Sequence, residues 1–380
     1  MKTSLAEKNK HITAIAPYSI FPAKMGGQKG IACFYSAFSE LLPTTLVSTQ
    51  NNGSPENIHA EFLPVLSNNK SRYINPYLFF IVNRIIKKNK STHLILEHPY
   101  LGWLGLMLKW YCNIRLVVHS HNIESLRFKS MGNWWWRILW HYEKFTHRHA
   151  DLNFFITDED RNYAIEKFRL SPEKCKTITY GFDLNSAPDA QEKLHAKNQL
   201  QTRYGISNEQ RILLFNGTLD YQPNLDALKI ILQKINPLLM QAGFSYKIII
   251  CGKNLPSSFN ELKDEAQNNI IYAGFVDDIN LYFKGADIFI NPVIDGGGIK
   301  TKLVEALGFN LTCISTREGA IGVPESITNG KLTIIKNNNW NEFSSAILHS
   351  KNNENHIGSD FFNYFYWKNI AQKAADAILH

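Results

Sequence analysis

Short apolar runs rich in β-branched residues alternate with amphipathic stretches along almost all of the 380-residue chain. The runs have the length of buried strands, and the stretches between them repeat apolar positions with the 3.6-residue period of helices. This alternation predicts an α/β protein with two doubly wound parallel sheets. The predicted strands lie at residues 11–16, 45–48, 93–96, 115–119, 152–156 and 176–179, and then at 211–216, 246–251, 270–272, 288–291 and 312–315. The predicted helices include residues 29–42, 76–88, 133–149, 224–241, 277–284 and 300–307.

A polar stretch between Phe182 and Gln199 has no strand pattern and separates the two sets of strands. A chain of this length usually holds more than one hydrophobic core. We therefore expect two Rossmann-like domains, over residues 1–185 and 199–355, followed by an amphipathic helix within residues 356–380. Ligands of open α/β sheets bind at the carboxyl ends of the strands, so the expected site is a cleft between the two sheets.

Composition narrows the class of protein without naming a function. Hydrophobic residues make up 44% of the chain and charged residues 19%, as in ordinary globular proteins. No run of eighteen apolar residues predicts a membrane-spanning helix, and residues 1–10 lack the pattern of a secretory signal. The five cysteines stand singly, with no CxxC pair and no His cluster at metal-binding spacing. These features predict reduced thiols, a cytoplasmic location and no bound metal.

Positive charge is concentrated in the first 150 residues. They hold 18 Lys and Arg against 7 Asp and Glu, a balance of +11, whereas the whole chain carries +8. Such asymmetry favours an anionic partner, which is a nucleic acid, a membrane surface or a phosphorylated substrate. No zinc-finger, RNA-recognition or helix-turn-helix signature accompanies it, so no nucleic-acid partner is expected.

The predicted helix over residues 133–150 carries part of this charge next to several tryptophans. Trp136 and Trp140 lie beside a basic stripe, and this combination suits peripheral attachment to an anionic membrane surface. The alternative is a solvated charged face with the tryptophans in the core. The stripe recurs at helical spacing and consists of Arg137, His141, Lys144 and Arg148. A second face, expected to pack on the sheet, consists of Ile138, Tyr142, Phe145 and His149.

The segment NPVIDGGGIKTKLVEAL, residues 291–307, has the pattern of a strand end, a triple glycine and an amphipathic helix. The glycines at 296–298 allow positive φ and close approach of a ligand, and the helix N-terminus after them favours a phosphate. Lys300 and Lys302 add cations there, and Glu305 lies one to two turns further along the helix. A plain glycine turn with solvated lysines is the structural alternative.

A second polar segment, HSHNIES at residues 119–125, directly follows a predicted strand. A lone His in a protein is more often structural than functional. Here His119 and His121 stand together with Asn122 and Glu124 at the end of a buried strand, where ligands of α/β proteins bind. This combination favours a functional site with His121 as the candidate catalytic residue.

Taken together, these segments resemble glycosyltransferase family 4. The glycine segment is similar to the donor-site signature of the subgroup with a GGGxKxKxxEA motif, and HSHNIES resembles the strand end that places a His in the cleft. The resemblance covers residues 12–367, and it rests on the shared order of several motifs. The other motifs are MGGQKG at 25–30, ITDEDRNY at 156–163, YGFD at 180–183, NGTLDYQPNLDAL at 216–228 and AGFVDDI at 273–279.

The resemblance implies the GT-B fold, in which two Rossmann-like domains face a central cleft, and a retaining transferase that needs no metal and no cofactor. The donor would be a nucleotide sugar linked to uridine or guanosine diphosphate. Glu305 would hold the donor ribose, and His121 would contact the transferring sugar or the acceptor. The helix within residues 356–380 would cross back onto the N-terminal domain. The implied donor-binding residues are Gly26, Gly27, Gly217, Phe275, Val276, Gly297, Gly298, Ile299, Lys300 and Lys302.

Two departures from the family pattern leave an alternative open. Many members carry a Glu where this chain has Gly297, and many carry an Arg and a Lys where Thr218, Leu219 and Pro223 stand here. Lys300 or Lys302 would then supply the missing positive charge. The alternative is a degenerate subunit that binds a nucleotide sugar without transferring it. A nicotinamide-dependent dehydrogenase is disfavoured because GGQKG is not the expected GxGxxG loop.

The expected function is therefore transfer of a sugar to a glycan or lipid-linked acceptor in cell-surface polysaccharide or lipopolysaccharide synthesis. Attachment to the inner face of the cell membrane would be peripheral, through residues 133–150.

Overall fold

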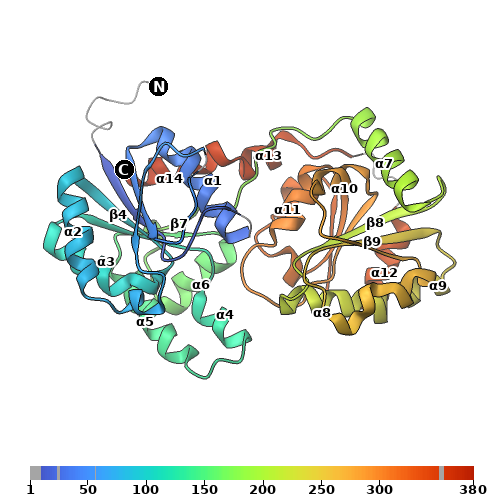
Figure 1. Cartoon of the computed structure of the whole chain (residues 1–380), viewed down its shortest axis with the longest axis horizontal. Helices are drawn as coiled ribbons and strands as arrows, with labels where there is room; N and C mark the ends of the chain where they lie inside the picture. The colour runs from blue at the N-terminus through green and yellow to red at the C-terminus, as the bar shows by residue number, and fades with distance from the viewer. Residues whose placement is uncertain (1–9, 24–25, 56, 351–354) are drawn as a thin grey trace. The chain divides into compact units, whose positions relative to one another are not determined.

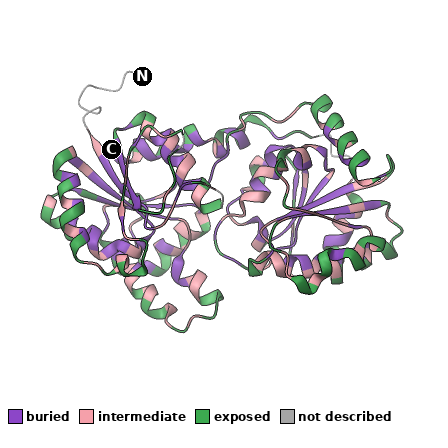
Figure 2. Cartoon of the chain, in the orientation of Figure 1, coloured by how far each residue is buried: buried purple, intermediate pink, exposed green. Residues whose placement is uncertain are grey.

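The computed structural model describes residues 10–23, 26–55, 57–350 and 355–380. The chain forms two compact units (Figure 1). The first comprises Met1–Asp183 and Tyr364–His380, and the second comprises Leu184–Asn363. In each unit, buried positions are concentrated in a central parallel sheet and on the inner faces of its helices (Figure 2). The predicted pair of doubly wound parallel sheets is confirmed.

Seven parallel strands form the sheet of the first unit, in the order β3-β2-β1-β4-β5-β6-β7. The strand order reverses direction between β1 and β4, and such a switch point is where open α/β sheets bind ligands. The strands are β1 (His11–Ile15), β2 (Thr44–Thr49), β3 (Glu61–Leu66), β4 (Ser91–Glu97), β5 (Arg115–Ser120), β6 (Leu152–Phe155) and β7 (Cys175–Thr177).

Helices cover both faces of this sheet. The helices are α1 (Gly26–Leu41), α2 (Tyr77–Asn89), α3 (Gly102–Cys112), α4 (Glu124–Ser130), α5 (Trp136–His149), α6 (Asp158–Phe168) and α14 (Trp367–Leu379). Helices α1 and α14 pack together, while α2, α3 and α5 lie side by side on the opposite face (Figure 1). A core of aliphatic side chains, which includes Leu94, Leu96, Leu104 and Leu116, joins α2 and α3 to the sheet. Burying such side chains contributes about 1.5–3 kcal/mol each.

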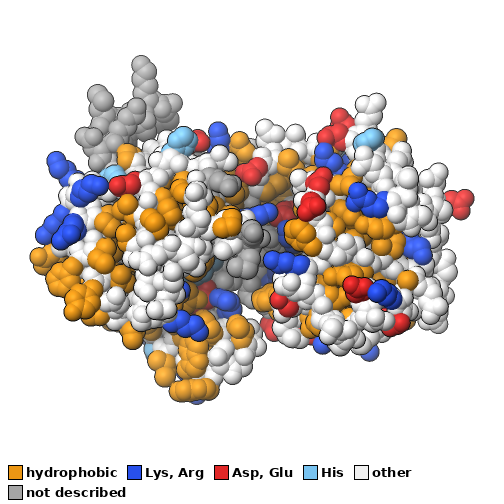
Figure 3. Space-filling view, viewed as in Figure 1, with side chains coloured by type: hydrophobic (Ala, Val, Ile, Leu, Met, Phe, Trp, Pro, Cys, Tyr) orange, Lys and Arg blue, Asp and Glu red, His pale blue; other side chains and the backbone are white. Residues whose placement is uncertain are grey.

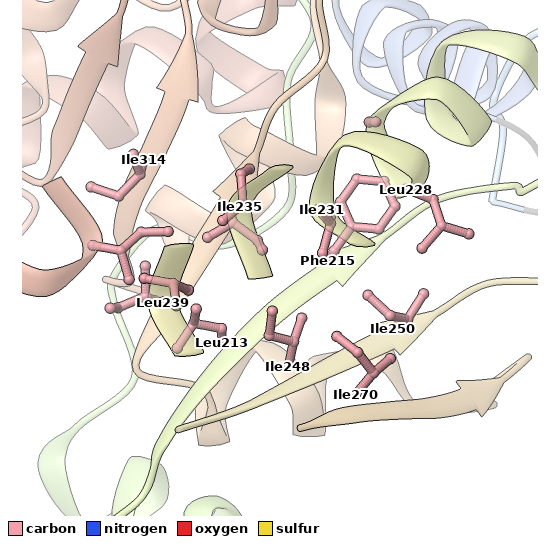
Figure 4. Packing of buried hydrophobic residues seen from close by; sticks show 14 of the residues in the cluster. Leu213, Phe215, Leu228, Ile231, Ile235, Leu239, Ile248, Ile250, Ile270 and Ile314 are labelled. Carbon is pink, nitrogen blue, oxygen red and sulfur yellow. The ribbon is translucent and has the colours of Figure 1, made fainter. Parts of the chain in front are cut away.

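The second unit has six parallel strands in the order β10-β9-β8-β11-β12-β13, with a switch point between β8 and β11. Its core contains Phe215, Ile231, Ile248 and Ile250 between the sheet and one helical layer (Figure 4). The strands are β8 (Arg211–Asn216), β9 (Tyr246–Cys251), β10 (Ile270–Gly274), β11 (Ile288–Asn291), β12 (Thr312–Thr316) and β13 (Leu332–Ile335). The helices are α7 (Ala190–Tyr204), α8 (Gln222–Ile230), α9 (Asn236–Gln241), α10 (Ile279–Gly285), α11 (Thr301–Gly308), α12 (Trp340–His349) and α13 (Ser359–Phe365).

Two edge strands were not predicted from the sequence. Strand β3 (Glu61–Leu66) contains Pro64, and its side chains are mostly exposed or half-buried. Strand β13 (Leu332–Ile335) is only four residues long. Edge strands tolerate Pro because one side of their backbone has no neighbouring strand to hydrogen-bond with. Their side chains are also less buried, so their apolar pattern in the sequence is weak.

The polar stretch after Phe182 contains a helix that the sequence pattern did not reveal. Helix α7 begins with a capping box between Asp189 and Glu192 and ends at Gly205, which has φ 63°. Most of its side chains are exposed, so it lacks a clear apolar stripe. The second unit therefore begins at Leu184 and includes this helix, whereas the predicted domain began at residue 199.

The end of the chain returns to the first unit. The helix predicted within residues 356–380 is interrupted at Tyr366, which forms an isolated parallel bridge with Phe182. The N–H of Phe182 donates to the Phe365 carbonyl at 2.9 Å. A Cβ on Gly181 would lie 2.7 Å from that carbonyl oxygen and from Trp367, so only Gly allows this approach. Helix α14 then packs against α1.

The inner face of α5 differs from the expected one. Ile138 and Phe145, expected to pack on the sheet, are 66% and 49% exposed. The buried face is polar instead and consists of Glu143, Thr146 and His147. The expectation that the apolar face packs inward was wrong, because hydrogen bonds to the site hold α5 in place. None of the helices in the described part of the chain has the length and apolar character needed to span a bilayer.

Candidate functional site

The switch point of the first sheet gathers titratable side chains from three strand ends. Tyr18 follows β1, Glu97 ends β4 and His98 follows it, and His121 follows β5. These residues are adjacent because β4 pairs with both β1 and β5 in parallel register. The three imidazole rings of His98, His119 and His121 lie close together, with centroids 4.5 Å apart for His98 and His121 and 4.9 Å for His119 and His121.

Glu97 is a fully buried carboxylate with three donors around it. Its Oε2 lies 2.7 Å from Nε2 of His121, and its Oε1 lies 3.1 Å from Nδ1 of His119. The hydroxyl of Tyr35 donates to Oε1 at 2.6 Å. Burial opposes ionisation, but the two imidazoles and their hydrogen bonds outweigh it and lower the pKa of Glu97 below its usual range. Glu97 is therefore an ionised acceptor.

This carboxylate determines which nitrogen of His121 carries the proton. An ionised carboxylate only accepts hydrogen bonds, so Nε2 of His121 must donate to it. Burial, together with the neighbouring His98, lowers the pKa of His121 to about 4, although Glu97 acts in the opposite direction. At neutral pH the ring is uncharged, and its Nδ1 carries a lone pair. The side chain keeps 13% exposure, so His121 is the partly accessible member of this pair.

A second carboxylate, Glu124, orients His98. Nδ1 of His98 lies 2.9 Å from Oε1 of Glu124, and Nε2 of His98 lies 2.9 Å from the hydroxyl of Tyr18. Tyr100 and Arg127 donate to Oε2 of Glu124 at 2.5 and 2.8 Å. Burial opposes ionisation of Glu124, but these partners prevail and lower its pKa to about 2. Tyr18, which is half-buried, is thus linked through His98 to a buried charge.

The backbone of His98 is strained. It has φ 67° and ψ 157°, a region that residues other than Gly rarely occupy. Such a conformation costs about 1–3 kcal/mol and persists only when the surroundings enforce it. Here the hydrogen bonds to Glu124 and Tyr18 hold the ring, and the His98 N–H donates to the His119 carbonyl at 2.9 Å. Strain of this kind is typical of functional sites.

Helix α5 supports the same site from below. The carboxyl of Glu143 accepts from the backbone N–H groups of Glu124 and Ser125 at 2.9 and 3.0 Å, and from the Ser125 hydroxyl at 2.6 Å. His147 contacts the Ser120 hydroxyl at 3.0 Å and Asn153 at 2.7 Å. The polar inner face of α5 therefore positions both Glu124 and the end of β5.

Glu97, His119 and His121 also form a donor set that could hold a metal ion, since their ligand atoms lie within 4.8 Å of one another. A metal on Nδ1 of His119 would force the proton onto Nε2. Within the described residues, Nε2 of His119 is buried and has no hydrogen-bond partner. Metal-bound His residues usually donate their second N–H to an acceptor. The arrangement fits the hydrogen-bonded carboxylate better than it fits a metal site.

The glycine segment lies at the switch point of the second sheet, between β11 and α11. Gly296 and Gly298 have φ 94° and 71°, the left-handed conformations that require Gly. A Cβ on Gly296 would lie 3.1 Å from Pro223, at the start of α8. Gly217, directly after β8, lies against Asn224 of α8 (Gln222–Ile230). Gly217 and Gly296 therefore both lie against the start of α8.

The two lysines of this segment have partners within the protein. The ammonium of Lys300 donates to the Gly296 carbonyl and, at 2.9 Å, to the Gly298 carbonyl. Lys302 pairs with Glu305 at 2.8 Å, Nζ to Oε2. Both lysines are half-buried, and Ile299 lies between them and the glycines. The positive charge of Lys300 therefore lies directly on the glycine loop.

The other predicted residues are spread more widely. Phe275 is 71% exposed and Val276 half-buried in the loop after β10, two strands away from β8. Gly26 and Gly27 open helix α1 in the first unit, where a Cβ on Gly27 would lie 3.9 Å from the Tyr18 hydroxyl. A cleft joining residues of both units stays a prediction.

Sequence reasoning missed Tyr18, Glu97, His98 and Tyr100. The available signal was the tetrapeptide EHPY at residues 97–100, which places a carboxylate, an imidazole and a phenol immediately after a buried strand. The EHPY tetrapeptide was overlooked because no glycine turn, the usual sign of a ligand-binding loop, follows the predicted strand over residues 93–96. Arg127 and Glu143 gave no signal, because their roles depend on packing between helices.

Two protein-family models match this chain. One, described as Glycosyltransferase Family 4, matches residues 41–186, and the other, Glycosyl transferases group 1, matches residues 210–353. The fold is shared with HepE of Anabaena in complex with UDP-glucose, at a TM-score of 0.68 and 17% identity over 96% of this chain and 98% of that one. The chain has the GT-B fold, and each of its two units matches a glycosyltransferase model.

Two further proteins resemble this chain. An uncharacterised 44.6 kDa protein in the cps region of Klebsiella pneumoniae is 23% identical over 299 residues, which cover 77% of this chain and 71% of that protein. WaaG, a glycosyltransferase involved in lipopolysaccharide biosynthesis, has a TM-score of 0.62 at 13% identity and covers 97% of this chain and 99% of that one.

Proposed function

We propose that this protein is a retaining glycosyltransferase that moves a sugar from a nucleotide diphosphate to a glycan or lipid-linked acceptor. The observation that carries the proposal is the glycine loop of residues 296–298. It lies at the switch point of the second sheet, against Pro223 at the start of α8, with the Lys300 ammonium on it and a helix N-terminus after it. Backbone N–H groups, the helix dipole and a cation together suit a diphosphate.

A donor linked to uridine or guanosine diphosphate fits this loop, and the complex of HepE with UDP-glucose supports uridine. Glu305 would hold the ribose, with the ion pair to Lys302 holding its carboxylate in place. Phosphate charge would be met by backbone N–H groups and Lys300, so catalysis needs no metal. His121 would contact the transferring sugar or the acceptor.

The acceptor is proposed to be part of cell-surface polysaccharide or lipopolysaccharide synthesis. The cps-region relative and WaaG support this placement. The enzyme would work at the cytoplasmic face of the membrane, attached through the helix of residues 133–150.

A groove on the first unit supports such attachment. It has a volume of about 350 Å³ and is lined by Lys129, Arg137, Lys167, Trp136 and Trp140, among others. The Lys129 ammonium lies 4.8 Å from the centroid of the Trp136 ring. Figure 3 shows basic and hydrophobic side chains together in this lower part of the unit. Cations beside tryptophans suit an anionic headgroup at a membrane interface.

A ligand screen followed by a transfer assay tests the proposal. We expect one of the UDP- or GDP-linked sugars to raise the melting temperature, since a ligand that binds only the folded state stabilises it. That donor should be consumed in the presence of lipid-linked acceptors, with retention of the anomeric configuration and without loss of activity in EDTA. Stabilisation without transfer to any acceptor would instead support the degenerate binding subunit, and an inverted anomer would contradict the retaining mechanism.

A further inference from the structure

The carboxylates of Glu97 and Glu124 determine the direction of every hydrogen bond at the edge of the first sheet. Both are buried and ionised, so each accepts from the ring nitrogen that faces it. His121 faces Glu97 through Nε2 at 2.7 Å, and His98 faces Glu124 through Nδ1 at 2.9 Å. The second ring nitrogen, Nδ1 in His121 and Nε2 in His98, faces away from the carboxylate.

We propose that Glu97 is a positioning residue that holds His121 in the tautomer whose Nδ1 accepts a hydrogen bond from a sugar hydroxyl. This inference rests on the proposed function, because a sugar ligand is assumed. Among the described residues, no hydrogen bond reaches Nδ1 of His121, and the side chain is partly exposed. An imidazole lone pair on a ring bound to a buried carboxylate accepts from a neutral hydroxyl and does not attract a phosphate.

Tyr18 provides a second acceptor of the same kind. When His98 is neutral, its Nδ1–H donates to Glu124 and its Nε2 lone pair accepts the Tyr18 hydroxyl proton at 2.9 Å. The Tyr18 oxygen then has only lone pairs left to offer a ligand. His98 and His121 are adjacent, so the two acceptors belong to one edge. The ligand class that fits is a neutral sugar edge that donates hydroxyl protons, from the donor sugar or from the acceptor.

The strained backbone of His98 agrees with this role. A residue with φ 67° and ψ 157° costs conformational free energy. Such strain is expected where the ring must be held in one orientation. If the ring turned over, Nε2 would face Glu124 and the Tyr18 hydroxyl would lose its acceptor. The site would then no longer present two lone pairs.

Nitrogen-15 NMR of the histidine rings of the full-length protein tests the proposal without an activity assay. At neutral pH we expect His121 to be protonated at Nε2 only, and we expect His98 to carry a proton on Nδ1, the nitrogen that faces Glu124. Glu97→Gln replaces an acceptor-only group with one that can donate to Nε2, so the variant should move the His121 proton towards Nδ1. Glu61→Gln is the matched control, because Glu61 accepts from Thr45 and Asn89 on the amino-terminal side of the sheet. It should leave His121 unchanged.

Ligand titrations complete the test, with glucose and inorganic phosphate as the probes at high millimolar concentration. Glucose should shift the unprotonated Nδ1 resonance of His121, and phosphate should not. Kinetics with the identified donor and acceptor then show whether Tyr18→Phe raises the KM for the donor or the KM for the acceptor. The affected substrate is the one whose sugar binds beside His121 and Tyr18. The Tyr142→Phe variant, which removes a hydroxyl bonded to the Trp103 N–H and the Tyr100 carbonyl, controls for loss of a phenol.

The outcomes are distinct. A His121 ring protonated at Nδ1 in the wild type, or a response to phosphate in place of glucose, overturns the proposal even if the Glu97→Gln variant does not fold. A His121 Nδ1 resonance that is unprotonated but indifferent to glucose overturns the hydroxyl-binding role. The expected tautomers and glucose response in a protein that transfers no sugar would leave this inference standing and refute the proposed function.

Discussion

Nε2 of His121 lies 2.7 Å from Oε2 of Glu97, although the two residues are 24 positions apart and belong to different strand ends. The parallel pairing of β4 and β5 places Glu97 opposite His119. The Glu97 carboxylate therefore contacts the imidazoles of both His119 and His121. The Glu97 side chain is fully buried, whereas the His121 side chain keeps 13% exposure. Glu97 therefore fixes an imidazole that remains partly accessible.

Replacing His121 with Ala should lower kcat more than it changes the KM for the donor. The ring is proposed to contact the transferring sugar or the acceptor, and losing such a contact in the transition state lowers the rate by roughly 10- to 100-fold. Steady-state kinetics with the donor and acceptor identified by screening would measure this. His59→Ala removes an exposed imidazole in the same unit and should leave the rate unchanged. Equal kcat in His121→Ala and wild type would contradict the assignment.

Removing Lys300 or Glu305 should weaken donor binding, because the two residues are proposed to meet the diphosphate and the ribose. Lys300→Ala and Glu305→Ala are each expected to raise the Kd for the nucleotide sugar by about tenfold or more, which corresponds to roughly 1.4 kcal/mol. Calorimetric titration measures Kd directly. Lys229→Ala, which removes a half-exposed lysine paired with Asp226 on α8, is the matched control. An unchanged Kd in Lys300→Ala would exclude this lysine from the phosphate site.

Gly296→Ala should destabilise the second unit and weaken donor binding together. Gly296 has φ 94°, and a Cβ there would press on Pro223 at 3.1 Å. The strained conformation costs about 1–3 kcal/mol. Urea unfolding measures the loss of stability. Gly297→Ala is the stability control, since Gly297 is exposed and does not have a positive φ, so a Gly297→Ala variant as unstable as Gly296→Ala would contradict the argument.

The free energy of unfolding should fall as the pH drops from about 6.5 towards 4. Burial lowers the pKa of His147 to about 4, although the hydrogen bond from its ring to Asn153 acts in the opposite direction. Between pH 6.5 and 4, His147 is protonated in the unfolded chain but not in the folded protein. Its contribution to the free energy of unfolding is therefore fully present above pH 6.5 and is lost as the pH falls towards 4. The contribution of this one group is roughly 3 kcal/mol.

Urea unfolding at several pH values measures this dependence. His147→Gln should make this dependence shallower by up to one proton, and His59→Gln, which removes an exposed ring, is the control variant. A His147→Gln variant with the wild-type slope would show that His147 titrates normally in the folded protein.

Vesicle sedimentation tests membrane attachment. Wild-type protein should sediment with vesicles that contain anionic lipid at low salt and be released as salt rises, since each cation contributes about 1 kcal/mol near such a surface. The Arg137/Lys144/Arg148→Glu variant should stay in the supernatant. Lys229/Lys234/Lys263→Glu makes the same change of charge on the second unit and should sediment as wild type does. If wild type and both variants stay in the supernatant at low salt, the membrane proposal is wrong.

The two sets of strands, the glycine loop and the polar end of β5 could be predicted from the residue order, because each depends on near neighbours along the chain. Apolar periodicity located the central strands, and the order of glycines, lysines and Glu305 indicated a phosphate-binding turn. The edge strands β3 and β13 escaped, since they bury too few side chains to leave a clear pattern.

Which side chains meet depends on how the strands and helices assemble. Glu97 joins His121 because β4 and β5 are paired in one register, and no local pattern encodes that register. Helix α5 turns Glu143 and His147 inward, although its apolar residues suggested another face, because their hydrogen bonds to Ser125, Ser120 and Asn153 exist only once the strands are assembled. Contacts between segments that are distant along the chain depend on how the whole unit packs. The side chains that act together can therefore be identified only in the folded protein.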